Sequence, residues 1–133
     1  MNLKQLILKN RSYRRFNQNK SISAETLKEL IDLARLSASA KNQQSLKYIL
    51  INTPYSNTKV FPELTWAGYL TNWEGPIESE RPSAYIICLH DKTIADTHFC
   101  DEGIAAQSIL LGAVEKGLGG CIIWSVNREN LRH

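Results

Sequence analysis

The sequence predicts an α/β (α+β) domain in which helices are layered on a sheet. Apolar stretches with helical spacing alternate along the chain with short apolar stretches that are prone to form strands. The short stretches are apolar at nearly every position, which is typical of strands covered on both faces. The length of 133 residues is that of one domain with a single hydrophobic core, so we expect residues 1–133 to form one domain.

Two helices are predicted in the first third of the chain. A short one follows the helical repeat of Leu3, Leu6 and Ile7 and ends near Asn10. The second is capped by Ser23. Its apolar stripe consists of Leu27, Leu30, Ile31 and Ala34.

The middle of the chain predicts two strands separated by a mixed region. Residues 46–51 are apolar and β-prone, long enough for one buried strand, and residues 83–89 form a second such stretch. Residues 52–82 contain all four prolines of the chain, and we expect loops there with a short helix around residues 63–70. Three aromatic residues of this region, Trp66, Tyr69 and Trp73, are candidates for a lid over a flat ligand, although packing explains them more simply.

The last third predicts a long buried helix and a third strand. Residues 99–116 are apolar on almost every side of a helix, which indicates burial against protein on most sides, and Gly117 is a fitting terminator. Residues 120–124 read as a strand. Asn127 caps a final helix of barely two turns, whereas isolated helices need about 12–15 residues. We therefore expect the chain to be cut inside an element of a longer protein.

Composition narrows the class of protein. The net charge of +3 is too small to argue for nucleic acid, and no apolar run approaches the roughly 20 residues that span a bilayer. No secretory leader is recognisable, so we expect a cytoplasmic location. Buried, reduced thiols are expected for Cys88, Cys100 and Cys121, and the scattered histidines predict no metal site.

Two segments carry candidate chemistry. Arg11, Ser12, Arg14 and Arg15 lie within residues 11–16, here called the basic cluster, and the first acidic residue of the chain is Glu25. Guanidinium groups suit phosphate oxygens, although a solvated basic turn is the simpler alternative. The polar segment, residues 37–45, offers hydroxyl and amide groups that suit a polar ring or a polyol, or it is a plain connection between helix and strand. Together they suggest a nucleotide-like or flavin cofactor.

These segments, with a third, resemble the FMN-dependent nitroreductase family. The pattern Arg11-Ser12-x-Arg14-x-Phe16 is followed by Ser39-Ala40-x-Asn42-x-Gln44 and an apolar strand. The third match is Asp101-x-Gly103-x-Ala105-Ala106-Gln107, which runs on to Gly117-Leu118-Gly119. The resemblance spans nearly the whole chain in family order, and it implies a central, mostly antiparallel sheet flanked by helices.

The resemblance also implies roles for matching positions. Arg11, Ser12 and Arg14 would hold the phosphate and ribityl hydroxyls of FMN. Ser39, Asn42 and Gln44 would face the ribityl chain and the pyrimidine edge of the isoalloxazine. The stretch around Trp124 and Ser125 would lie near flavin N5. The flavin itself carries the redox chemistry, so no catalytic side chain is required.

The implied activity is transfer of hydride from NAD(P)H through bound FMN to a nitroaromatic, a quinone or a similar small aromatic acceptor. The flavin would lie between the subunits of a homodimer, and the apolar helix predicted over residues 99–116 supports burial in such an interface. Relatives often have a basic residue at the position of Asn10, Pro-Trp at Ser45-Leu46, and a C-terminal arm beyond the position of His133. We expect this chain to lack that arm.

Two alternatives remain at this level. One is a flavin-binding protein without turnover. The other is a small basic module that binds nucleic acid through the basic cluster, which predicts steeply salt-dependent binding and a colourless protein. Few aromatic residues lie among its basic residues, which disfavours this second alternative.

Overall fold

A computed structural model describes all residues of the chain, 1–133. Its helices are α1 (Leu3–Lys9), α2 (Ala24–Leu36), α3 (Pro54–Val60), α4 (Asp101–Glu115) and α5 (Arg128–Leu131), with 3₁₀ turns η1 (Ala40–Asn42) and η2 (Phe61–Glu63). Its strands are β1 (Leu46–Ile51) and β2 (Tyr85–His90). The predicted α+β class is confirmed, and the sheet is small. None of the helices combines the length and the apolar character that a bilayer crossing needs.

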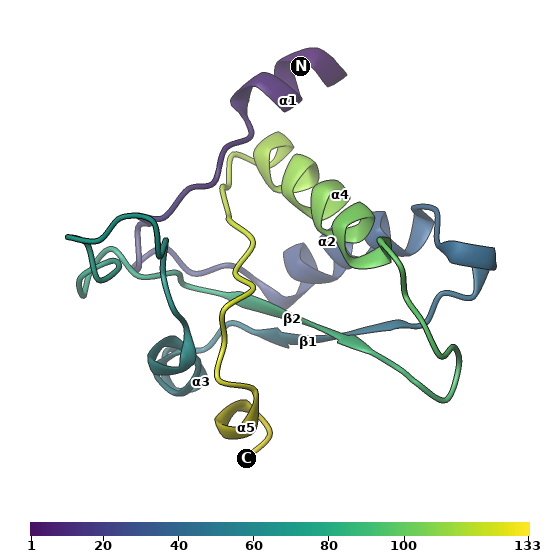
Figure 1. Cartoon of the computed structure of the whole chain (residues 1–133). Coiled ribbons are helices and arrows are strands. Elements are labelled where there is room, and N and C mark those ends of the chain that lie inside the picture. The colour runs from purple at the N-terminus through teal and green to yellow at the C-terminus, as the bar shows by residue number, and fades with distance from the viewer.

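The two strands form an antiparallel ladder from the pair Leu46–His90 to the pair Ile51–Tyr85. Helices α2 and α4 lie together over one side of this sheet, whereas α3 and α5 lie at its other side (Figure 1). The predicted first strand has the same bounds as β1, and the second prediction overlaps β2. The apolar, β-branched composition of both stretches is therefore a sufficient local signal.

The core lies where α2 packs against α4. Leu27, Leu30 and Ala34 of the predicted stripe are buried in this contact region, and Ser23 caps α2 by accepting the Thr26 N–H. The approach is close, because a Cβ on Gly112 of α4 would lie 2.3 Å from the Leu33 Cδ1 atom. The most buried members of α4 are Asp101, Ala105, Gly112, Ala113 and Val114.

Helix α4 is less enclosed than predicted. The helix itself is confirmed within the predicted range, and Gly117 adopts the left-handed conformation of a helix terminator, with φ of 74°. Gly103 and Gln107, however, are exposed, and the bulky Leu110 and Leu111 are only half-buried. In the single chain α4 is covered by α2 along one face, so burial on all sides is not observed.

Two predictions for the chain path are wrong. Residues 120–124 form no strand, because Gly120 and Val126 make only isolated bridges, to Ser12 and Leu64. The partner segments are irregular, so no continuous ladder can form. The helix predicted over residues 63–70 is also absent, because α3 and η2 occupy residues 54–63 and the chain after Glu63 is irregular.

The thiols are free, as predicted, but the prediction that they are buried is wrong. Cys88 and Cys100 are exposed and Cys121 is half-buried. Cys88 lies on β2 opposite Tyr48. A two-stranded sheet is too narrow to enclose both faces, which explains why the sequence pattern overestimated burial.

Candidate functional site

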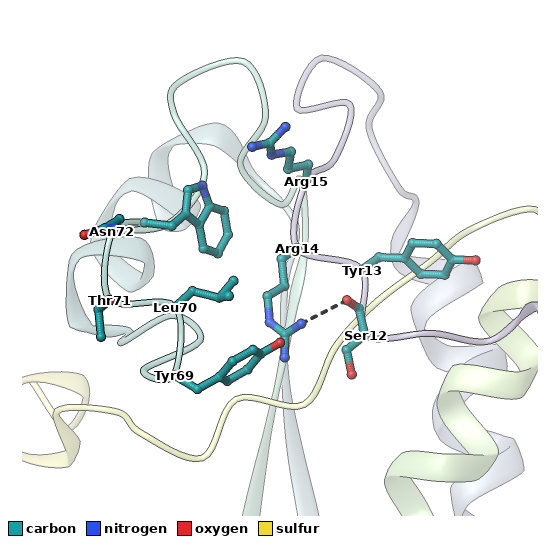
Figure 2. A pocket seen from close by; sticks show the side chains of 9 residues that line it. Ser12, Tyr13, Arg14, Arg15, Tyr69, Leu70, Thr71 and Asn72 are labelled. Carbon is teal, nitrogen blue, oxygen red and sulfur yellow. Dashed lines mark hydrogen bonds between the residues drawn. The ribbon is translucent and has the colours of Figure 1, made fainter.

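An open cleft with a volume of ≈ 750 Å³ lies between the basic cluster and a loop that follows η2. Its walls are residues 12–15 on one side and residues 69–73 on the other. Figure 2 shows the Arg14 side chain in the middle of this cleft, with Tyr69 and Leu70 facing it from the loop. Two segments far apart in the sequence therefore meet at one cationic site.

The basic cluster is anchored through its backbone. The Tyr13 N–H donates to the Gly120 carbonyl at 3.0 Å, and the Phe16 N–H donates to the Glu80 carbonyl at 2.8 Å. The Tyr13 ring lies against Gly119, where a Cβ would come within 2.6 Å of its Cδ2 atom. The close approach explains why small residues follow α4 at this point. These contacts hold the arginines in a defined place.

The three arginines of the cluster have different surroundings. Arg14 donates to the Ser12 carbonyl at 3.3 Å, its guanidinium lies 5.6 Å from the centre of the Tyr69 ring, and it pairs with no carboxylate. Arg15 lies 3.8 Å from a Glu80 oxygen. Arg11 folds back onto the carbonyls of Ile7 and Asn10 and does not line the cleft. Arg14 is thus the cation best placed to receive an anion.

An aromatic cluster supports the opposite wall. Trp66 is buried, and its ring centre lies 6.4 Å from that of Phe16, 6.0 Å from that of Phe61 and 6.5 Å from that of Trp73. Trp66 therefore has the packing role that we considered the simpler one. Tyr69, by contrast, is 72% exposed beside Arg14, so its ring is free to contact a ligand.

Gly75 is a sensitive point of this wall, and we expect Gly75→Ala to destabilise the protein by about 1–3 kcal/mol. Its φ of 120° disfavours any L side chain, and a Cβ would lie 2.8 Å from the buried Trp66 ring. Urea unfolding followed by tryptophan fluorescence measures the change. Gly68→Ala in the same loop is the matched control, because nothing lies within 4 Å of a Cβ there. An equal loss in both variants would contradict this explanation.

The polar segment forms a tight turn away from the cleft. Lys41, Asn42 and Gln44 have left-handed φ values of 53°, 54° and 52°. The Gln44 N–H donates to Ser39 Oγ at 3.1 Å, and Gln44 Nε2 donates to Asn42 Oδ1 at 2.9 Å. The side chains of Asn42 and Gln44 are exposed. The turn therefore presents amide groups to the surroundings in a fixed backbone shape.

A single chain does not bring all of the predicted site residues together. Only Ser12 and Arg14 of that set line the cleft. In Figure 1 the blue connection between α2 and β1, which holds the polar segment, lies on the opposite side of the molecule from the purple segment that follows α1. The basic cluster and the polar segment, which the sequence predicts to form one cofactor site, therefore lie on two separate surfaces of a single chain.

The segment after Gly120 presents unpaired backbone groups. Between the bridges at Gly120 and Val126, the residues 121–124 make no backbone hydrogen bond, whereas the Ser125 carbonyl accepts the Thr65 N–H at 2.9 Å. Trp124 is 66% exposed, with the Arg128 guanidinium 5.8 Å from its ring centre. Extended backbone with free donors and acceptors can bind the edge of a polar ring.

Cys88 and Cys121 do not supply a nucleophile. Partial burial of the Cys88 thiol raises its pKa to about 11 even though the residue as a whole is exposed, and the Glu102 carboxylate adds to the rise. Burial also raises the pKa of Cys121, although the nearby Arg14 lowers it in part. Burial raises the pKa of both Tyr48 and Tyr85 to about 12. At neutral pH these four groups keep their protons, and none of them lines the cleft.

Residues 70–72 of the cleft were missed by sequence reasoning. Leu70, Thr71 and Asn72 follow no motif, and only the aromatic neighbours Tyr69 and Trp73 drew attention to this stretch. They lie in a turn in which the Leu70 N–H donates to the Ala67 carbonyl and the Trp73 N–H donates to the Leu70 carbonyl. Aromatic residues in a loop rich in turn formers are the one available signal.

The fold and the cleft together define an α+β domain that presents a cationic binding cleft beside an unpaired extended segment. The predicted family resemblance is confirmed, because residues 7–69 match the model of the nitroreductase family. That match includes the basic cluster, the polar segment and part of the cleft loop. No curated protein matches the chain.

Solved structures of nitroreductases share the fold. A nitroreductase family protein from Clostridium novyi NT aligns with a TM-score of 0.77 and 21% identity, over 99% of this chain and 74% of the other. A nitroreductase family protein from Clostridium difficile 630 aligns with a TM-score of 0.76 and 21% identity, over 100% of this chain and 76% of the other. A putative nitroreductase from Exiguobacterium sibiricum, solved in complex with FMN, aligns with a TM-score of 0.76 and 14% identity, over 98% of this chain and 78% of the other.

Proposed function

We propose that this protein is an FMN-dependent oxidoreductase that passes hydride from NAD(P)H to a nitroaromatic, a quinone or a similar acceptor. The observation that carries the proposal is Arg14, a guanidinium without a carboxylate partner in an open cleft. The family match over residues 7–69 and the FMN bound in the Exiguobacterium relative support the choice of cofactor.

The donors of the cleft fit a phosphate group. Arg14 donates only to the Ser12 backbone carbonyl, and the Ser12 hydroxyl makes no hydrogen bond within the chain, so both side chains can donate to a ligand. Arg11 donates only to the nearby carbonyls of Ile7 and Asn10, so no carboxylate competes with an anion for its guanidinium. Guanidinium–phosphate contacts are strong and geometrically selective, which is what the phosphate end of FMN requires.

The polar segment and residues 121–124 fit the remainder of the cofactor. Ser39, Asn42 and Gln44 carry both donors and acceptors, as the ribityl hydroxyls and the pyrimidine edge need. The unpaired backbone of residues 121–124 can hydrogen-bond to the ring. Bound FMN would supply the capacity to accept and release hydride. The protein's own part is to bind and orient the cofactor and to keep water from the reacting face.

A homodimer would bring the two surfaces together. The basic cluster of one subunit would hold the phosphate, while the polar segment of the other would approach the ring. Helix α1 supports an additional protein surface, because Leu3, Ile7 and Leu8 are exposed and no residue of that helix is buried. Sedimentation equilibrium should then give about twice the chain mass of 15.1 kDa.

The activity is tested under anaerobic conditions with purified protein and added FMN. Without an acceptor we expect NADH or NADPH to be oxidised at most in proportion to the FMN present, and we expect continued oxidation, followed at the absorbance band of the reduced nicotinamide, only when a quinone or nitroaromatic acceptor is added. The Arg14→Ala variant should show lower activity that excess FMN restores. Protein that retains FMN but oxidises neither cofactor with either acceptor would contradict the enzyme assignment.

A further inference from the structure

Asp101 is a buried carboxylate that faces the polar segment. It is the first residue of α4 and only 4% exposed. Its Oδ1 atom accepts the Ala40 N–H at 2.9 Å, and this is the one hydrogen bond that the carboxylate makes within the chain. No lysine, arginine or histidine pairs with it. A buried charge without a cation is costly, so the backbone contact and the start of α4 must stabilise it.

The partner of Asp101 begins the strained part of the segment. Ala40 is the first residue of η1, and three of the next four residues have the left-handed conformation. Such a conformation is unfavourable for residues other than glycine. It persists only where the surroundings hold it. The Ser39–Gln44 hydrogen bond closes the turn locally but does not fix the turn to the rest of the domain.

Helix α4 attaches the segment at a second point. Ser37 and Ser108 approach with their hydroxyl oxygens 2.6 Å apart, about two helical turns from Asp101. The two contacts join the start and the middle of the segment to one rigid helix that α2 also covers. The backbone of residues 37–40 is therefore fixed to the core, and the left-handed stretch follows it directly.

We propose that Asp101 is a positioning residue for the polar segment, and through it for the ring end of the cofactor. This inference rests on the proposed function, because the segment is there assigned to the ribityl and pyrimidine groups. Asp101 touches neither FMN nor acceptor; it acts by holding the Ala40 amide, and with it the backbone that carries Asn42 and Gln44.

Dissociation constants for FMN and for riboflavin test the proposal. Asp101→Ala should raise the dissociation constants of both flavins by about tenfold, because the two flavins share the ring end that the polar segment contacts. Asp101→Asn should stay close to wild type, since the amide oxygen can accept the same N–H. Glu102→Ala is the matched control from the same helical turn, because its carboxylate contacts His98 instead. It should leave both constants unchanged.

Hydrogen exchange of the amides of residues 40–44 gives a readout without flavin. We expect faster exchange in Asp101→Ala and wild-type exchange in Asp101→Asn. If Asp101→Ala does not fold, Ala40→Pro removes the N–H donor and keeps the carboxylate, and it should weaken both flavins in the same way. Normal flavin affinity in Asp101→Ala or, if that variant does not fold, in Ala40→Pro would overturn the proposal, and so would an equal loss of affinity in Glu102→Ala.

Failure of the proposed function looks different. If wild-type protein binds neither flavin, the assignment of the site is wrong, whatever the exchange data show. If the wild-type protein binds FMN, and Asp101→Ala has the same amide exchange rates and the same flavin affinity as wild type, only the positioning role of Asp101 is wrong.

Discussion

Replacement of Arg14 by alanine should weaken FMN binding by about 10- to 100-fold and leave riboflavin binding nearly unchanged. FMN differs from riboflavin only by its phosphate, and Arg14 is the guanidinium in the cleft that pairs with no carboxylate. The variant therefore removes a charge-assisted contact that only FMN can make. Isothermal titration with each flavin measures the two affinities.

Arg35→Ala provides the control for Arg14→Ala. Arg35 lies on the surface of α2 and pairs with Asp32 at 2.7 Å, away from the cleft, so its loss changes the net charge equally. FMN affinity should be retained in this variant. An equal loss for riboflavin in Arg14→Ala would instead show that Arg14 supports the shape of the cleft rather than the phosphate.

Leu30→Ala should destabilise the domain by about 2–5 kcal/mol, which is the cost of emptying a buried leucine site. Leu30 is 3% exposed and lies between α2 and α4, near Gly112. Two side chains of α4, Asp101 and Ser108, hold the polar segment, which follows directly on α2. Loss of packing between α2 and α4 should therefore also loosen that segment. Urea unfolding followed by circular dichroism measures the loss of stability.

The control for the core substitution is Leu36→Ala in the same helix. Leu36 is 66% exposed, and its replacement should change the free energy of unfolding by less than about 0.5 kcal/mol. Similar losses in the two variants would show that helix propensity, rather than packing against α4, accounts for the effect of Leu30→Ala.

Elements with strong local signals were predictable from the sequence. The Ser23 cap, the stripe that includes Leu27 and Leu30, and the β-prone stretch 46–51 each specify their structure through neighbours in the chain. Asn127 likewise caps α5 by accepting the Asn130 N–H. In these places short-range chemistry and the final packing agree, which is why the predictions hold.

Elements that depend on distant partners were not predictable in the same way. Residues 120–124 have the composition of a strand, but a strand also needs a regular neighbour, and their contacts are irregular. Pro54 was interpreted as a loop residue, whereas it occupies the first turn of α3 behind the Thr53 cap, where proline is well tolerated.

The candidate site divides in the same manner. The basic cluster is recognisable in the sequence because three arginines lie close together with no acidic residue before Glu25, and Arg14 does lie in the cleft. The role of Asp101 could not be read from the sequence, where an acidic residue at a helix start is explained by the helix dipole alone. Its contact with Ala40 joins residues 61 positions apart, and only the folded arrangement of α2 and α4 creates it.

The visible absorption spectrum of the purified protein, after addition of FMN and exhaustive dialysis, tests the central claim most directly. We predict retained flavin bands at a ratio near one FMN per chain, and their loss on dialysis of Arg14→Ala. A wild-type protein that is colourless after this treatment, at a concentration where it is folded by circular dichroism, would contradict the assignment of the cleft to FMN.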